Sequence, residues 1–275
     1  MTTSRDIFQT LNDQPVETLD RIVARMEERG REPRFIKMRG DYLDLVQLQS
    51  ARTFLDLGCG TGLDARAAAK RPEFKGVATG VDLSTGMIAA GEKLAEEEGV
   101  TDRVLLRPGD AAATGLPSGT MDVVVMHTLV SHVADPAAVL REAARLLGPR
   151  GRILVFDADF ASIAFAYPDG GIAKAMEASL LETFVANPRV MRDLPSLLPA
   201  CGLRIEATQS HILADAGTTT FFVGMLENYA PNVANMGLQP EALANAWLDH
   251  QRRNISSGTF FGSLNFHAYL LRPIA

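Results

Sequence analysis

Two histidines and a glycine-rich segment are the parts of this sequence whose residue types could do chemistry. His127 and His132 lie in Met126-His-Thr-Leu-Val-Ser-His-Val133, directly after an apolar run. Imidazole titrates near neutral pH, so either ring could take a proton from a hydroxyl or hold it by a hydrogen bond. We favour His132, because its place after an apolar pair lets it point back toward a cleft. Gly58-Cys-Gly-Thr-Gly62 follows an earlier apolar run, and glycines let a backbone approach a ligand closely.

Acidic residues stand near the glycine segment and after the next two apolar runs. Asp82 comes twenty residues past the last glycine of that segment and could accept both hydroxyls of a ribose. Asp110, in Gly109-Asp-Ala111, could accept an adenine amino hydrogen; capping or turn roles are the alternatives for both acids. Asp56 and Asp64 flank the glycine segment, which suits a ligand with an ammonium group and disfavours a pyrophosphate.

Short apolar strands that alternate with helical stretches must position these residues. The predicted strands cover residues 53–57, 76–81, 103–107, 121–126, 151–156, 203–213 and 260–271. We expect helices over the first 50 residues, with Gly30 as a C-cap, and a largely helical stretch over 217–253 that is interrupted near Pro231 and Pro240. This alternation indicates βαβ units and a parallel sheet covered on both faces. The ends of consecutive strands would then form one crevice at the switch point of the sheet.

Composition narrows the class of protein. The 275 residues are 47% hydrophobic and 22% charged, which is ordinary globular usage. The net charge of −6 disfavours nucleic acid as a partner, and a small-molecule substrate fits better. With only two cysteines and no apolar run near the ~18 residues of a membrane span, we expect a cytoplasmic protein. The oligomeric state stays open, with a homodimer as one option.

Four motifs resemble class I S-adenosylmethionine-dependent methyltransferases, especially the ubiquinone/menaquinone-biosynthesis type and the natural-product small-molecule methyltransferases. They are Leu-Asp-Leu-Gly-Cys-Gly-Thr-Gly, Gly-Val-Asp-Leu-Ser, Gly-Asp-Ala and Met-Asp-Val-Val-Val-Met-His. The resemblance covers residues 50–157 well and the rest only in layout. It implies an α/β fold with a Rossmann-like, seven-stranded, mostly parallel sheet, helices on both faces and the last strand antiparallel. It also implies a helical cap over 1–50 and a methyltransferase domain over 51–275, with helical lid insertions at about 160–200 and 215–255.

The resemblance further implies S-adenosyl-L-methionine as the cofactor and a set of residues around it. These residues are Asp56, Gly58, Cys59, Gly60, Gly62, Asp82, Leu83, Met87, Asp110, Ala111 and His127. Transfer from a sulfonium is an in-line displacement, so proximity and alignment can supply most of the catalysis. A base, His132 or His127, is needed only where the acceptor must lose a proton. We expect no metal, because the fourth strand ends in Met126-His127 rather than in acids.

Apolar side chains outside the motif region are expected to surround the acceptor. The candidates are Met38, Tyr42, Phe160, Tyr167, Phe184 and Phe222, for which ordinary helix packing is the alternative. Arg39, Arg192 and Arg204 are candidates for holding a carboxylate of the acceptor.

The sequence therefore predicts a methyltransferase acting on a small, largely apolar or aromatic acceptor, such as a quinone precursor or a secondary metabolite. One alternative is a cofactor-binding protein of this fold without turnover. A nucleotide-dependent oxidoreductase is disfavoured, because Leu63 stands where the third glycine of a dinucleotide-binding motif would lie.

Overall fold

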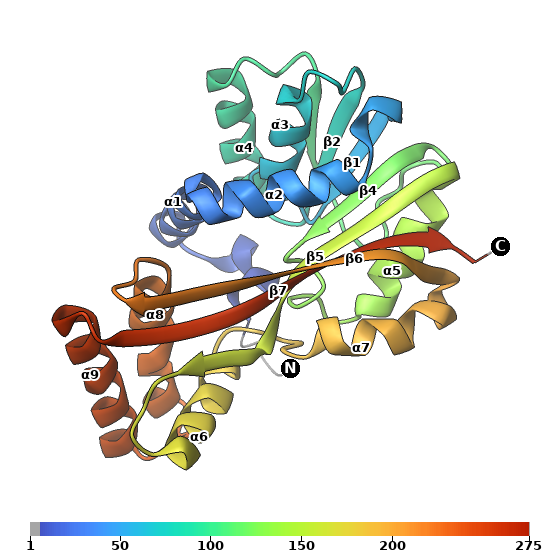
Figure 1. The fold of residues 1–275 in the computed structure, drawn as a ribbon. Helices are drawn as coiled ribbons and strands as arrows, with labels where there is room; N and C mark the ends of the chain where they lie inside the picture. Colours follow the sequence, from blue (N-terminus) through green and yellow to red (C-terminus); the bar gives the residue numbers. More distant parts are fainter. Residues whose placement is uncertain (1–5, 275) are drawn as a thin grey trace.

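A seven-stranded sheet forms the centre of the computed structural model, which describes residues 6–274 (Figure 1). Its strands are β1 (Thr53–Leu57), β2 (Val77–Asp82), β3 (Val104–Pro108), β4 (Met121–His127), β5 (Leu147–Phe165), β6 (Leu203–Gly217) and β7 (Phe260–Pro273). The strand order is β3-β2-β1-β4-β5-β7-β6. Neighbours from β3 to β5 are parallel, whereas β7 is antiparallel to both β5 and β6. The predicted fold class, including the antiparallel last strand, is confirmed.

Helices cover both faces of this sheet. They are α1 (Val16–Arg31), α2 (Pro33–Leu45), α3 (Leu63–Lys70), α4 (Thr85–Glu97), α5 (Pro136–Leu146), α6 (Gly170–Leu181), α7 (Val190–Leu197), α8 (Phe221–Asn235) and α9 (Glu241–Ser257). Short 3-10 turns are η1 (Ile7–Gln9), η2 (Leu11–Asp13), η3 (Leu48–Ser50) and η4 (Leu198–Cys201). Within residues 6–274, no helix has both the length and the apolar character needed to cross a membrane.

Alternation along the strands produces two hydrophobic layers. Phe54 packs with α2 and α3 on one face, while Leu55 and Leu57 pack with α5 and α7 on the other. This is the pattern expected of a parallel strand buried on both sides, since successive side chains point to opposite faces. The sheet is thereby fixed as a rigid platform, and the carboxyl ends of β1, β2 and β4 meet at one edge.

The far halves of β5, β6 and β7 project beyond this platform and carry α6, α8 and α9 (Figure 1). The fifth strand was predicted to end at residue 156 but continues to Phe165. It does so because it keeps pairing with β7 past an irregularity between Asp159 and Ala164. We call β5, β6 and β7 beyond the platform, together with α6, α8 and α9, the extension; Trp247 of α9 is fully buried in it.

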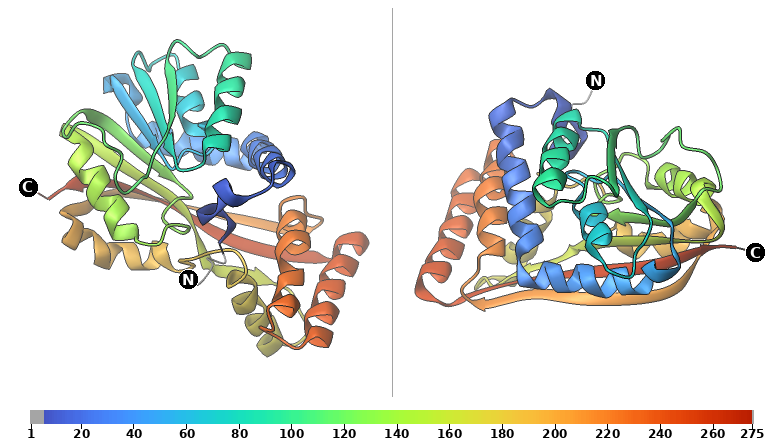
Figure 2. Two further views of the ribbon diagram at one scale, coloured as in Figure 1. Left: turned by 180° about the vertical axis from the view of Figure 1, so that it is seen from behind. Right: turned by 90° about the horizontal axis from the view of Figure 1, so that it is seen from above.

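Two predicted helix boundaries are wrong. Gly30 was expected to cap the first helix, but α1 continues to Arg31, and Gly30 is buried against Leu63. Pro231 was expected to interrupt the helical region, yet α8 passes through it. A proline removes one helical hydrogen bond, and the buried contacts of α8 in the extension outweigh that loss. Helix α1 lies between α4 and α8 (Figure 2).

Candidate active site

The turn between β1 and α3 carries three glycines in the left-handed region of backbone conformation. Their φ angles are +69° at Gly58, +54° at Gly60 and +72° at Gly62. All three also touch distant parts of the chain: a Cβ at Gly58 would lie 2.3 Å from Leu129, one at Gly60 would lie 2.8 Å from Met26, and one at Gly62 would lie 2.7 Å from Leu106. Glycine is therefore required here both for conformation and for close approach. We call residues 58–62 the glycine turn.

Asp82 lies at the end of β2, beside the glycine turn. One carboxylate oxygen accepts a hydrogen bond from the Gly60 N–H at 2.7 Å, and the other accepts one from the Ser84 N–H at 2.8 Å. Burial raises the pKa of Asp82, while these two hydrogen bonds act in the opposite direction. Because each carboxylate oxygen can accept a second hydrogen bond, Asp82 can still receive hydroxyl donors while it fixes the turn.

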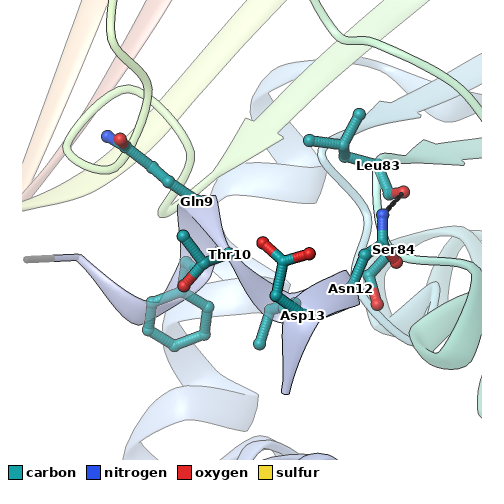
Figure 3. A pocket seen from close by; sticks show the side chains of 8 residues that line it. Gln9, Thr10, Asn12, Asp13, Leu83 and Ser84 are labelled. Carbon is teal, nitrogen blue, oxygen red and sulfur yellow. Dashed lines mark hydrogen bonds between the residues drawn. The ribbon is translucent and has the colours of Figure 1, made fainter. Parts of the chain in front are cut away.

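A pocket of about 260 Å³ lies between the N-terminal segment and the β2–α4 turn (Figure 3). Leu83 and Ser84 form one side, and residues 8–13 form the rest. Asn12 holds the two sides together: its amide donates to the Leu83 carbonyl at 2.9 Å and accepts from the Thr85 N–H at 3.1 Å. The N-terminal segment thus covers the residues directly after Asp82.

Two other residues predicted around the cofactor, Asp56 and Cys59, are buried. Asp56 is 2% exposed and accepts a hydrogen bond from the Ala65 N–H at 3.1 Å, under the first turn of α3. Burial raises the pKa of Asp56 well above its ordinary value, and the negative charge of Asp64 adds to this. Cys59 points toward Gly80 of β2, and burial raises the pKa of its thiol well above the ordinary value.

Four further cofactor candidates differ in exposure. Leu83 is 56% exposed and lines the pocket, whereas Met87 is fully buried in a cluster with Leu11 of the N-terminal segment. Asp110 is exposed and accepts a hydrogen bond from the Ala112 N–H at 2.8 Å, which closes a turn just after β3. Ala111 lies in this turn and is partly buried.

His127, the last residue of β4, belongs to a buried polar cluster. Its Nδ1 lies 3.2 Å from Asp64 Oδ2 and 2.9 Å from the Tyr42 hydroxyl. The Tyr42 hydroxyl donates to the same Asp64 oxygen at 2.6 Å, and Arg39 Nε donates to the other oxygen at 2.9 Å. Burial alone would raise the pKa of Asp64, but His127, Arg39 and the Tyr42 hydroxyl lower it below its ordinary value. Asp64 is therefore an anion held by three donors.

These hydrogen bonds fix the tautomer of a neutral His127. Because the Tyr42 proton is committed to Asp64, Nδ1 must be the donor, and the lone pair is on Nε2; we assign this from the network. Nε2 is buried and has no partner among residues 6–274. The ring therefore presents a free proton acceptor, with a carboxylate behind it to stabilise the imidazolium.

His132 forms a second aspartate–histidine pair. Its Nδ1 lies 2.7 Å from Asp6 Oδ2, and its ring packs against Phe8 with the centroids 4.6 Å apart. Beyond His132, ring contacts continue from Phe160 to Phe184 and from Phe184 to Tyr229, at 5.5 and 4.5 Å between centroids. We call Phe160, Phe184 and Tyr229 the aromatic row.

The predicted acceptor residues fall into two groups. Phe160 and Phe184 belong to the aromatic row, and Met38 and Tyr42 are buried in α2, with Tyr42 against His127. Tyr167 instead packs edge-on against His250, and Phe222 packs in the core of the extension. The structure therefore brings Tyr42 and Phe160 against the histidines and Phe184 against Phe160, and it places the other three in helix packing.

Sequence reasoning missed Asp6 and Arg29. Asp6 contacts His132 across 126 residues of sequence, and no local pattern signals such a pair. Arg29 lies on a helix whose charged residues all look like a solvated face. The spacing of Arg25 and Arg29, one helical turn apart, was the available signal. Of the predicted basic residues, Arg39 reaches the site, whereas Arg192 pairs with Asp159.

Comparison with known proteins agrees with this geometry. Residues 55–155, from β1 into β5, match the family model described as a methyltransferase domain. That segment contains the glycine turn, Asp82 and His127. The fold is that of class I S-adenosylmethionine-dependent methyltransferases, and residues 55–155 are similar to a methyltransferase domain; S-adenosyl-L-methionine is the cofactor of that class.

The chain is similar to two curated proteins and to one solved structure, among others. It is 38% identical to nocamycin O-methyltransferase of Saccharothrix syringae over 111 residues, which is 40% of this chain and 39% of the relative. It is 28% identical to an uncharacterised 37.1 kDa protein in transposon TN4556 of Streptomyces fradiae over 227 residues, 82% of this chain and 64% of the relative. The [4+2]-cyclase SpnF shares the fold, with a TM-score of 0.52 and 19% identity over 87% of this chain and 81% of that one. The chain spans less than two thirds of either relative's length.

Proposed function

We propose that this chain transfers a methyl group from S-adenosyl-L-methionine to a small, largely apolar or aromatic acceptor. The observation that carries the proposal is the convergence of three features at one edge of the sheet. These are the glycine turn, the Asp82 carboxylate and a buried His127 Nε2 that has no partner among the described residues. The nocamycin relative, which is an O-methyltransferase, supports an oxygen acceptor.

The residues at the turn fit this cofactor. Gly58 and Gly60 would approach it through backbone alone, and Asp82 keeps hydrogen-bonding capacity for ribose hydroxyls. The side chains that lie on the turn, those of Leu129 and Met26, are flexible apolar ends that can move aside. When bound, the cofactor supplies an activated methyl group together with its leaving group.

The chain's own residues then orient the acceptor and take up its proton. The aromatic row offers flat apolar surface against which a ring can stack and from which water is excluded. His127 Nε2 would accept the proton of an acceptor hydroxyl, and Asp64 would stabilise the imidazolium that results. We propose His127 rather than His132 as the base because its Nε2 is buried without a partner in the described part of the chain and its aspartate lies in the first turn of α3, next to the glycine turn.

We further propose that residues 1–50 serve as a cap over the cofactor and that the insertions at about 160–200 and 215–255 enclose the acceptor. The support is that Asn12 bonds to both Leu83 and Thr85 and that Phe184 and Tyr229 come from these insertions.

The test combines calorimetry with S-adenosylhomocysteine and transfer of labelled methyl groups to a panel of phenols and quinols. His127→Gln should lower kcat by roughly 10²- to 10⁴-fold, with cofactor affinity unchanged. His132→Gln is the matched variant. A larger loss of kcat in His132→Gln than in His127→Gln would identify His132 as the base. Cofactor binding without any methylated acceptor would support a binding protein without turnover. Binding of NAD(P)H in place of S-adenosylhomocysteine would support an oxidoreductase.

A further inference from the structure

Helix α1 faces the glycine turn with one flank and the extension with another. Glu27 lies on the first flank, where it accepts a hydrogen bond from a threonine hydroxyl of the turn at 2.6 Å. On the second flank the Arg25 guanidinium lies 5.7 Å from the ring centroid of Tyr229, and that of Arg29 lies 5.5 Å from the centroid of Phe35. Two cations of α1 therefore border the aromatic side of the site.

Arg29 has no hydrogen-bond acceptor and no ion-pair partner for its guanidinium within residues 6–274. It is partly buried, and burial lowers the pKa of Arg29. Other covered arginines are paired: Arg66 lies 2.5 Å from Glu27, and Arg34 lies 2.5 Å from Asp215. A covered guanidinium without an anion is costly, so its partner is expected to be a ligand.

Arg39 contributes a second donor without a partner. Its Nε donates to Asp64 at 2.9 Å, and its Nη1 donates to the Gly30 carbonyl at 3.2 Å, directly after Arg29 in the chain. Its Nη2 is buried and has no partner in the part of the chain that the structure describes, and the side chain as a whole is only 8% exposed. Because Arg39 bonds to the carbonyl of the residue next to Arg29, the two side chains lie in one region, and the positive charge of Arg39 lowers the pKa of Arg29 further.

Asp64 pairs with Arg39, but no acid forms an ion pair with Arg29 within residues 6–274. The charge of Asp157, at the end of the core part of β5, raises the pKa of Arg29 without forming an ion pair with it. The carboxylate of Asp157 is already occupied, because it accepts hydrogen bonds from the Ser131 N–H at 3.1 Å, the Ser131 hydroxyl at 3.0 Å and the Ala158 N–H at 2.8 Å. The charge of Arg29 and the Nη2 donor of Arg39 therefore stay unmatched beside aromatic rings.

We propose that Arg29 and Nη2 of Arg39 bind a carboxylate that belongs to the methyl acceptor, which makes the acceptor an aromatic acid. This rests on the proposed function. Arg25 lies over Tyr229, the end of the aromatic row, and Arg29 lies one helical turn further along α1, over Phe35. An aromatic acid that stacks on the row can therefore reach Arg29 with its carboxylate. Tyr229 belongs to α8, outside the methyltransferase domain segment, and this favours the acceptor over the cofactor as the source of the carboxylate.

The cofactor also carries a carboxylate, and the experiment separates the two sources. Calorimetry would measure 4-hydroxybenzoate, benzoate and their neutral amides on the protein saturated with S-adenosylhomocysteine. The acids should bind roughly 10- to 100-fold tighter than the amides. Arg29→Gln should abolish that preference, and Arg29→Lys should keep part of it. Arg21→Gln, an exposed position of the same helix, is the control for lost charge.

Two results would overturn the proposal. One is equal binding of acids and amides by the wild-type protein. The other is that Arg29→Gln weakens S-adenosylhomocysteine while leaving both the acids and 5′-methylthioadenosine, which lacks the amino-acid carboxylate, unaffected. The comparison of acids with amides is repeated on the cofactor-free protein. A failure to bind S-adenosylhomocysteine, which contradicts the proposed function, therefore leaves the test of Arg29 standing.

Discussion

Asp64 Oδ2 lies 3.2 Å from His127 Nδ1, although 63 positions separate the two residues in the sequence. Asp64 opens α3 directly after the glycine turn, and His127 ends β4, which pairs with β1. The contact therefore joins the proposed cofactor-binding turn to the proposed base. A displacement of the first turn of α3 would also displace the imidazole.

Asp64→Asn should lower kcat by roughly 10²- to 10⁴-fold, because an amide neither fixes the Nδ1–H tautomer nor stabilises an imidazolium. Affinity for S-adenosylhomocysteine should change little. Steady-state kinetics and calorimetry on the same preparation measure the two effects. Asp102→Asn, in an exposed turn, is the control. Full turnover in Asp64→Asn would mean that alignment alone drives transfer.

Asp82→Ala should weaken binding of S-adenosylhomocysteine by about 1–3 kcal/mol, the scale of unmet buried hydrogen bonds. Part of that loss comes from the turn itself, since Asp82 also accepts from the Gly60 and Ser84 amides. Asp82→Asn retains one acceptor oxygen and should lose less. Calorimetric affinities that match the wild type in both variants would refute the placement of the ribose.

The sheet could be predicted from the sequence because its signals are local. Short, mainly apolar runs mark β1 to β4, and each is followed by a polar residue or a glycine at the same edge. Asp82 and the glycine turn were found in this way. The continuation of β5 to Phe165 could not be found, because it depends on pairing with β7, about a hundred residues later.

The site residues that could not be predicted from the sequence are those whose contacts are made with residues far away in the chain. Glu27 and Arg29 lie on a helix rich in charge, which local pattern treats as a solvated face, yet Glu27 is 5% exposed and pairs with Arg66. The preference for His132 came from position alone. The difference between His127 and His132 becomes visible only once Tyr42 and Asp64 are placed beside one of them.

Glu142 gives a prediction about acid stability. Hydrogen bonds from Arg145 and Thr114 lower the pKa of Glu142 from 4.5 to about 2. A carboxyl group with a lowered folded-state pKa stabilises the fold above pH 4.5 and loses that contribution as the pH falls toward 2. Glu142→Gln should therefore reduce the free energy of unfolding near neutrality and approach the wild-type value near pH 2. Denaturant titrations across this range measure it, with the exposed Glu97→Gln as control; a gap between variant and wild type that stays constant with pH would contradict the assignment.

The glycine turn can be tested against a matched glycine elsewhere. Gly58 and Gly99 have nearly equal φ angles, +69° and +67°, so an alanine at either position costs about 1 kcal/mol or slightly more in backbone strain. The surroundings of the two glycines differ. A Cβ at Gly58 would lie 2.3 Å from Leu129, whereas a Cβ at Gly99 would have no atom within 4 Å.

Gly58→Ala should therefore destabilise the protein more than Gly99→Ala and weaken S-adenosylhomocysteine binding by tenfold or more, roughly 1.4 kcal/mol. Adding Leu129→Ala to Gly58→Ala removes the clash and should recover the extra loss of stability. Affinity should stay low in that double variant, because the new Cβ still occupies the space above the turn. Recovery of both stability and affinity would show that Leu129, rather than a bound cofactor, is what requires glycine at position 58.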